Sequence, residues 1–519
     1  MKVKISTLFC YFLFAISLFS QNPVILADLN PGVNSGINEW NYTGILYKDK
    51  YYLPADNGKT GLELYVIEDQ NISLFMDLFN GSKASDPANF IIYKEKIYFT
   101  AKDSLYGNEL WFTDGTIQGT QRVSDVIAGP GFSNPTGLII GADEMLYFSS
   151  NDLLFRTDGT KAGTIQIIGP ERVEIGKNAF ASSRAVPYKD GLAIIVNNTF
   201  EGEVVWYIKK DGSAHELYRS KSHELDILGI QNVNGKLLFG LSNDISGKDK
   251  GIYVYDETQL KFIVILNIEP SRIVKLTDQL VLIKTYSEYY ITDGTAGGTS
   301  SLLQGSNILV QEDPINLVRC KDQWVFNSIK DFTNNIITIT DGTKLNTREL
   351  IRPSDLITNI LNRENFVFYI SGYTNNFRAE FWYVNCQNME AKQFYKPAVN
   401  SGYIAYTPLF LTQDKLYFIG NLGSGREIYS ISTGLVISKS NNLEQNDVIL
   451  RQFNDNSFII EGENGDFKVE LLNLNGQSLN QKKVQSNSYF NFDLIQSGIY
   501  IMQISSGTYN KTIKVFLNQ

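Results

Sequence analysis

The sequence contains few of the residues that most enzymes use for acid–base, thiol or metal chemistry. Two histidines occur among 519 residues, His215 and His223, and they lie close together in one segment. This leaves almost no material for a histidine-based triad, a histidine general base or a zinc site. No glycine-rich phosphate loop follows an expected strand and opens a helix. The sequence therefore identifies no catalytic residue and no cofactor-binding residue.

Cysteine is too scarce to build a disulfide framework. Of three cysteines, Cys10 lies in the apolar N-terminal run, which leaves Cys320 and Cys386. These two could form one disulfide or stay as two buried thiols, and the sequence favours neither. A large hydrophobic core must therefore hold the fold together, and the chain is long enough to bury one.

Long apolar runs are absent except at the N-terminus. Lys2 and Lys4 precede the apolar run Ile5–Phe19, and Ser20 follows it. A basic start, an apolar stretch and a small residue are typical of a secretory signal peptide, and the run is shorter than the roughly 20 residues that span a bilayer. A membrane anchor is the alternative. We predict a signal peptide over residues 1–20, a mature chain from Gln21, and no transmembrane segment.

Basic residues are outnumbered by acidic ones, 46 to 55, which gives a formal charge of −9. Loss of Lys2 and Lys4 with the signal peptide makes the mature chain still more acidic. An acidic surface disfavours nucleic acid and anionic lipid, whose phosphates attract basic patches. Neutral glycans and proteins stay open as ligands.

The sequence does contain a clear internal repeat with a period of about 45 residues. An apolar triplet recurs nine times, usually after a short polar turn that follows another apolar run, which predicts a β-hairpin. The triplets begin at Tyr51, Ile97, Leu146, Leu192, Leu237, Leu280, Trp324, Phe366 and Leu416.

The second half of each unit is best represented by Glu109–Thr120, where Glu-Leu-Trp-Phe-Thr-Asp-Gly-Thr precedes a later Gly-Thr. Its Trp111 position is aromatic in eight of nine copies and Thr338 in the other, which predicts packing between repeats. The aromatic residues are Tyr65, Trp111, Phe155, Trp206, Tyr253, Tyr290, Trp382 and Tyr429. Asp-Gly-Thr predicts a turn, because glycine accepts positive φ and aspartate bonds its own backbone.

Four short strands in about 45 residues form a unit the size of a propeller blade. We therefore predict an all-β fold: a single large β-propeller over residues 22–437, made from nine units as eight or nine four-stranded blades. Propellers typically have four to eight blades. One unit could thus be split between strands from both ends of the chain, or could pack outside the ring. Two smaller propellers are the alternative.

The units resemble the ELWxxDGT repeat of large secreted bacterial proteins. The resemblance is specific at Glu109–Thr120 and weaker at Glu203–Ser213 and Glu380–Asn385. It supports the fold prediction and implies little about function.

A different β pattern follows the repeats. Residues 438–447 are polar and linker-like, and residues 448–519 predict a small β-sandwich. This segment resembles the type A C-terminal sorting domain of cargo of the type IX secretion system in Bacteroidetes, although the usual Pro-Asn-Pro opening is absent. An ordinary β-sandwich is the alternative. The matching residues are Asn475, Gly476, Gln477, Ser497, Gly498, Ile499, Tyr500 and Lys514.

The resemblance implies contact with the type IX secretion machinery and export across the outer membrane. The protein would then be secreted or attached to the outer cell surface.

Carboxylates are the only candidates for acid–base or metal chemistry. The turn residues Asp114, Asp158, Asp293 and Asp341 offer oxygen atoms, which Ca²⁺ prefers, and are weak calcium candidates. Glutamate recurs at the start of the third expected strand, and recurrence favours a scaffold role over one catalytic pair. These residues are Glu63, Glu109, Glu203, Glu288, Glu380 and Glu427.

Three functions remain open. A propeller offers a broad, loop-lined face, which favours a binding or adhesion protein with a glycan or protein ligand. A polysaccharide-degrading enzyme could use paired carboxylates. A structural component of the cell surface or of its motility machinery is the third.

The signal-peptide prediction is tested by N-terminal sequencing of the exported protein. We expect the sequence to begin at or near Gln21, because signal peptidase cleaves after a small residue. Exported protein that still begins at Met1 would refute the prediction.

Overall fold

The computed structural model describes the chain from Asn22 to Leu517 with internal gaps. The gaps are residues 33, 38–42, 124–132, 172–183, 199–201, 221–224, 244–249, 257–260, 267–269, 286–287, 303–316, 331–333, 352–356, 364, 372–379, 397–403, 413–414, 422–424, 434–448, 455–456, 462–465, 474–476, 486–488, 493–497 and 507–508. The predicted signal peptide, residues 1–20, lies outside the described residues. Two compact units are present, Met1–Ile437 and Ser438–Gln519.

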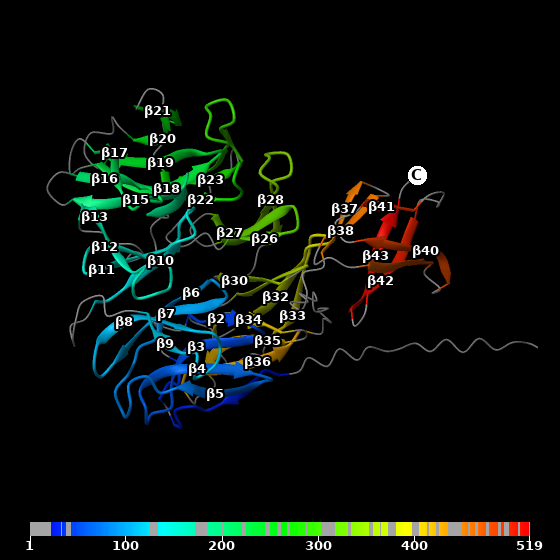
Figure 1. The fold of residues 1–519 in the computed structure, drawn as a ribbon, viewed down its shortest axis with the longest axis horizontal. Coiled ribbons are helices and arrows are strands. Elements are labelled where there is room, and N and C mark those ends of the chain that lie inside the picture. The colour runs from blue at the N-terminus through cyan, green and yellow to red at the C-terminus, as the bar shows by residue number, and fades with distance from the viewer. Residues whose placement is uncertain are drawn as a thin grey trace, which may run out of the picture. The chain divides into compact units, whose positions relative to one another are not determined.

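The described regular structure of the first unit is nine four-stranded antiparallel sheets, here called blades 1 to 9 in chain order (Figure 1). Blade 1 contains β2 (Ile45–Tyr47), β3 (Lys50–Asp56), β4 (Leu62–Glu68) and β5 (Asn71–Met76); blade 2 contains β6 (Ala88–Tyr93), β7 (Lys96–Asp103), β8 (Gly107–Thr113) and β9 (Gln121–Arg122); blade 3 contains β10 (Thr136–Ile140), β11 (Leu146–Ser150), β12 (Leu153–Thr157) and β13 (Ile165–Glu171).

The next three blades repeat the same order. Blade 4 contains β14 (Ala185–Tyr188), β15 (Gly191–Asn198), β16 (Gly202–Ile208) and β17 (Ala214–Arg219); blade 5 contains β18 (Leu225–Val233), β19 (Lys236–Asn243), β20 (Gly251–Asp256) and β21 (Lys261–Leu266); blade 6 contains β22 (Pro270–Lys275), β23 (Val281–Thr285), β24 (Tyr289–Thr292) and β25 (Ser300–Ser301).

The last three blades include the one that joins the two ends of the unit. Blade 7 contains β26 (Leu317–Cys320), β27 (Gln323–Lys330), β28 (Asn334–Thr340) and β29 (Arg348–Ile351); blade 8 contains β30 (Ile357–Arg363), β31 (Phe366–Ser371), β32 (Glu380–Asn385) and β33 (Glu390–Tyr395); blade 9 contains β34 (Ile404–Leu411), β35 (Lys415–Asn421), β36 (Glu427–Ser432) and, from the N-terminal end, β1 (Val24–Ala27).

Blade 9 combines strands from both ends of the chain, which is one of the arrangements that the count of nine repeats allowed. Its fourth strand is β1, which pairs antiparallel with β36 so that Val24 lies opposite Ser430 and Ile25 opposite Tyr429. Backbone pairing therefore joins the two ends of the unit. Figure 1 shows the blue strands β3 and β4 beside the gold strands β35 and β36.

Each blade buries a hydrophobic cluster against the next. Eight such clusters join the consecutive pairs of blades, from blades 1 and 2 around to blades 8 and 9. The remaining cluster joins blade 9 to blade 1, where the rings of Tyr51 and Phe410 stack with centroids 4.4 Å apart. The nine blades thus form one closed ring, and the prediction of a single large propeller is confirmed.

The recurring aromatic residue packs between its own blade and the preceding one. Trp111 lies in the cluster of blades 1 and 2, Phe155 in that of blades 2 and 3, and Tyr429 in that of blades 8 and 9. Within several blades it stacks on the third residue of the apolar triplet directly across β-strands, as in Phe148–Phe155 at 5.6 Å and Phe418–Tyr429 at 5.9 Å. Full burial of such a ring contributes about 1.5–3 kcal/mol.

The two remaining cysteines form a disulfide, which the sequence could not decide. Cys320 ends β26 in blade 7, and Cys386 follows β32 in blade 8, with 5.2 Å between their Cα atoms. Both are buried in the hydrophobic cluster that joins these blades. The bond fixes blades 7 and 8 to one another across a sequence separation of 66 residues.

The Asp-Gly-Thr turns are stabilised by hydrogen bonds within each turn. In the turn of blade 2, Asp114 Oδ1 accepts hydrogen bonds from the backbone N–H and the hydroxyl of Thr116, at 2.9 and 2.8 Å. Thr116 Oγ1 in turn accepts the N–H of Gly119 at 2.9 Å. A Cβ at Gly119 would come within 2.1 Å of Asp114 Oδ1, so glycine is required there for space.

The same turns also touch the preceding blade. Gly159 has a φ of +96°, and a Cβ added there would lie 2.3 Å from the hydroxyl of Tyr98 in blade 2. The ammonium group of Lys94, also in blade 2, donates to the Asp158 carbonyl at 3.1 Å. The turn is therefore a second contact between neighbouring blades, after the hydrophobic cluster.

The second unit contains two antiparallel sheets. One holds β37 (Ile449–Asn454), β38 (Ser457–Glu461) and β41 (Tyr489–Asn491). The other holds β39 (Asp466–Leu472), β40 (Ser478–Gln485), β42 (Gly498–Ser506) and β43 (Tyr509–Leu517), in the order β40-β39-β42-β43. Phe467, Val469 and Leu471 alternate along β39 and are buried, as a strand with one face toward a core requires.

No helix in the described part of the chain is long and apolar enough to cross a membrane.

The glycine of the turn can be tested by substitution. Gly159→Ala should lower the free energy of unfolding by about 2 kcal/mol, because the methyl group meets Tyr98 and the positive φ is strained for alanine. The matched control is Gly235→Ala, in the turn between β18 and β19, where φ is also positive at +74° and a Cβ would meet nothing within 4 Å. Urea denaturation of both variants measures the difference, and equal effects would show that the turn does not depend on the neighbouring blade.

Candidate functional site

The carboxylates that the sequence singled out lie in different blades. We call Glu63, Glu109, Glu203, Glu288, Glu380 and Glu427 the strand-start glutamates, because each stands at the start of the third strand of its blade. All are buried except Glu288, which is half-buried. Buried carboxylates need hydrogen-bond partners, and those partners reveal their role.

Glu63 binds the segment that leads from blade 1 to blade 2. Its carboxylate accepts the backbone N–H of Leu78 at 2.8 Å and that of Ser85 at 3.0 Å. The Ser85 hydroxyl donates a third hydrogen bond at 2.5 Å. Burial raises the pKa of Glu63 above its usual value, while these three donors oppose the shift. The carboxylate therefore fixes the connection between blades.

Glu427 does the same where the ring closes. Its carboxylate accepts the N–H of Gly36 at 2.8 Å and that of Leu29 at 3.3 Å, both in the segment between β1 and β2. Burial raises its pKa to about 7, with the Gly36 and Leu29 donors opposing and Asp28 adding to the rise. A residue of blade 9 thus fixes the entry into blade 1.

Cations accompany two other strand-start glutamates. Glu203 accepts the N–H of Ile227, in the first strand of the next blade, and forms an ion pair with Arg184 at 2.7 Å. Glu380 forms an ion pair with Lys396 at 2.5 Å, directly after the last strand of blade 8. These four glutamates thus hold the connections at the ends of their blades, and the six strand-start glutamates lie in six different blades.

The four turn aspartates also remain apart, in blades 2, 3, 6 and 7. Hydrogen bonds from Thr116, Thr160 and Thr295 lower the pKa of Asp114, Asp158 and Asp293 respectively. Within the described residues, no group of three or more His, Cys, Asp or Glu could hold a metal ion. Calcium binding at these turns stays a prediction. His215 lies exposed on β17, and His223 is outside the described residues.

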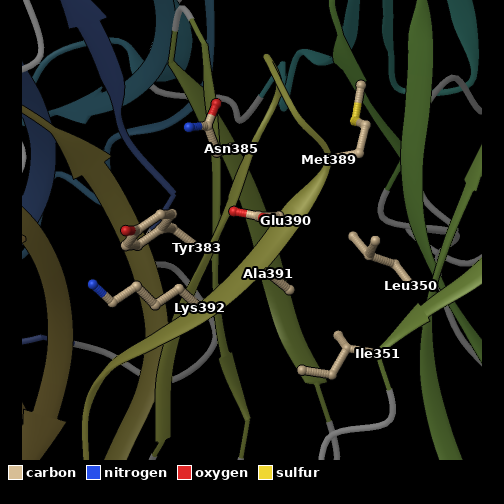
Figure 2. Close-up of a pocket in the computed structure, with 8 residues that line it drawn as sticks. All are labelled: Leu350, Ile351, Tyr383, Asn385, Met389, Glu390, Ala391 and Lys392. Carbon is tan, nitrogen blue, oxygen red and sulfur yellow. The ribbon is translucent and has the colours of Figure 1, made fainter.

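The candidate binding site is a groove of about 520 Å³ at the outer strands of blades 7 and 8 (Figure 2). Leu350 and Ile351 of β29 lie on one side of it, and Met389 and Ala391 of blade 8 on the other. These four side chains pack on the cluster that contains the disulfide. The volume falls in the range of about 300–1,000 Å³ that small-ligand sites occupy.

The polar lining of the groove comes from one face of blade 8. Tyr383 lies opposite Lys392, and Asn385 opposite Glu390, so these four side chains share a face of the sheet. Burial, with the Glu390 carboxylate, raises the pKa of the Tyr383 hydroxyl. Ala391 is on the opposite face, as the alternation of a strand requires. Because both faces of β33 contribute to the lining, the groove includes the outer edge of this strand.

Sequence reasoning did not find this groove. It depends on β29 and β33 lying side by side, although they are separated by about 40 residues in the chain. The one sequence signal for the groove is the alternating pattern Glu390-Ala391-Lys392, which by itself predicts only an exposed strand.

Part of the sorting-domain motif lies within the described residues. Asn475, Gly476 and Ser497 lie outside the described residues. Gln477 donates its N–H to Asn473 Oδ1 at 2.9 Å, which closes the turn before β40. Gly498, Ile499 and Tyr500 begin β42, and Lys514 in β43 pairs with Ile501.

Comparison with known proteins identifies the second unit. Residues 454–518 match the family described as the secretion system C-terminal sorting domain. The second unit is thus a type IX secretion sorting domain, which implies outer-membrane secretion or surface attachment. No curated protein matches the chain. The resemblance of the ring to the ELWxxDGT repeat stays a prediction.

Several solved structures resemble this chain at low identity and with TM-scores below 0.5. A prolyl endopeptidase is 10% identical over 76% of this chain and 55% of its own, with a TM-score of 0.41. The extracellular domain of BT4673 from B. thetaiotaomicron is 12% identical over 92% of both chains, with a TM-score of 0.28. PorZ, an essential surface component of the type IX secretion system of Porphyromonas gingivalis, is 14% identical over 92% of this chain and 75% of its own, with a TM-score of 0.29. This chain spans about half the length of the endopeptidase, and these likenesses concern the fold alone.

The pKa of Glu427 predicts how ring stability depends on pH. Because the folded-state pKa of about 7 lies above the usual 4.5, protonation of Glu427 favours the folded ring. Its contribution is fully present below about pH 4.5 and is lost as the pH rises through 7, on the order of 2 kcal/mol. Glu427→Gln should flatten the dependence of the unfolding free energy between about pH 5 and pH 8, since glutamine does not titrate.

Denaturant titrations across this pH range measure the effect. Glu68→Gln, which removes an exposed carboxylate on blade 1, should keep the wild-type slope. An unchanged slope in Glu427→Gln would mean that Glu427 is ionised in the folded ring throughout this range.

Proposed function

We propose that the protein is a secreted or surface-attached binding or adhesion protein, in which the ring carries the ligand site and the second unit is the export signal. The match of residues 454–518 to the sorting-domain family carries this proposal. In this scheme the type IX secretion machinery is the partner of the second unit, and the ligand of the ring is a protein or a neutral glycan.

The use of carboxylates in the ring supports binding over catalysis. The buried glutamates Glu63 and Glu427 bind backbone N–H groups of the connections between blades, and Glu203 binds one in the first strand of the next blade. They are therefore occupied in holding the scaffold. Glycoside hydrolysis requires two carboxyl groups about 5–10 Å apart in one pocket. The groove between blades 7 and 8 is lined by a single carboxylate, Glu390.

The composition of the groove supports a peptide or glycan ligand. Leu350, Ile351 and Met389 form an apolar side, and the polar side chains of Tyr383 and Lys392 lie on the other face of blade 8, so a ligand would reach both around the outer edge of β33 (Figure 2). Such a mixture of apolar walls with a few polar groups is typical of ligand sites.

Deletion of residues 448–519 separates export from binding. Because the two units have separate cores, the truncated protein should keep nearly the same thermal stability and any ligand binding. In the native host it should accumulate in the periplasm, and fusion of residues 438–519 to a periplasmic reporter should carry the reporter out of the cell. Cell fractionation and immunoblotting measure both results. Export of the truncated protein, or retention of the fusion, would contradict the export role.

A further inference from the structure

The outer strand of blade 8 has a free edge. In the described part of the chain, β33 pairs with β32 on one side and with no strand on the other. An unpaired strand edge presents N–H and C=O groups that can pair with another strand. The residues that line the groove of about 520 Å³ come from both faces of β33 and from β29, so the groove includes this edge.

We propose that β33 pairs with β33 of a second copy of this protein, antiparallel and centred on Ala391. Two copies of blade 8 would then form one continuous sheet across a twofold axis. In a twofold interface the same residues meet from both sides, so the strand must be complementary to itself.

The charge pattern of β33 meets this requirement. Glu390 and Lys392 are both exposed and lie on the same face of the strand, on either side of Ala391. In the proposed register Glu390 lies opposite Lys392 of the partner subunit, and Lys392 opposite the partner's Glu390. Opposite charges that face each other across antiparallel strands stabilise the pair by roughly 0.2–1 kcal/mol each, whereas like charges destabilise it.

No other outer strand of the nine blades carries this pattern. Among them, β5, β1 and β25 lack charged residues altogether. In β17 the opposite charges Glu216 and Arg219 already pair with each other at 2.5 Å. In β29 Arg348 and Glu349 are adjacent, and successive residues point to opposite faces. Lys392, in contrast, has no ion-pair partner among the described residues.

The surroundings hold β33 in place for such pairing. The disulfide Cys320–Cys386 fixes blade 8 to blade 7 directly beside the groove. Asn388 donates to one oxygen of Glu390 at 2.8 Å, which orients this carboxylate and leaves its second oxygen for the partner. A rigid edge loses little conformational freedom on association, which favours binding.

Charge exchange tests the proposal on the mature full-length chain. Sedimentation velocity at up to about 100 µM, where a complex of micromolar affinity is populated, should show a dimer for the wild type. Lys392→Glu and Glu390→Lys should each be monomeric, because like charges would face each other. The double variant E390K/K392E should regain the dimer. Lys161→Glu, which makes the same charge change in an exposed turn of blade 3, should leave the dimer intact, and circular dichroism should verify that all variants are folded.

A cross-link tests the register independently. Ala391→Cys should form a disulfide-linked dimer under oxidising conditions, because Ala391 lies opposite itself on the twofold axis. Leu345→Cys, at an exposed position in a turn of blade 7, should not. A wild type that is monomeric at all concentrations would overturn the proposal. So would a dimer that Lys392→Glu leaves intact, or single variants that the double exchange does not rescue.

Discussion

The structure depends on the coupling of each blade to the next. A four-stranded sheet has two faces and cannot bury either without a neighbour, so a lone unit of this sequence has no core. The hydrophobic clusters supply most of the stabilisation, but they are not directional. Direction comes from the strand-start glutamates, since Glu63 binds Leu78 and Ser85 on the way to the next blade and nowhere else. The ring is therefore specified by polar bonds and stabilised by apolar burial.

Ring closure uses the same coupling with parts from opposite ends of the chain. Glu427 binds Leu29 and Gly36 just as Glu63 binds its own exit segment, although nearly 400 residues separate the partners. Because β1 is the fourth strand of blade 9, the chain leaves the ring from β36, the third strand. The ring is consequently complete only when the N-terminal segment has paired. The second unit follows the ring without contributing a strand to any of the nine blades.

Much of this architecture could be predicted from the sequence, because the period is a local property repeated many times. The position of Trp111 predicted contact between repeats, and the sheet pairing follows from the hairpins. The repeat at Glu203–Ser213 matches the motif only weakly in sequence but still forms the same turn. Asp211 Oδ1 accepts hydrogen bonds from the N–H and the hydroxyl of Ser213, as in the other turns. The disulfide and the groove could not be predicted, because each depends on two blades meeting. Neither Cys320 and Cys386 nor β29 and β33 are related by any local pattern.

The one blade without the recurring aromatic residue shows how the ring tolerates variation. In blade 7 Thr338 lies opposite Phe326, where other blades place an aromatic ring on the equivalent phenylalanine. The missing ring is replaced from the preceding blade: Tyr289 of blade 6 packs edge-on against Phe326, with centroids 5.3 Å apart. Because adjacent blades share one core, either of them can fill the space. The packing requirement therefore falls on the content of each seam between blades and not on each repeat alone, so repeats can differ in sequence while the ring remains closed.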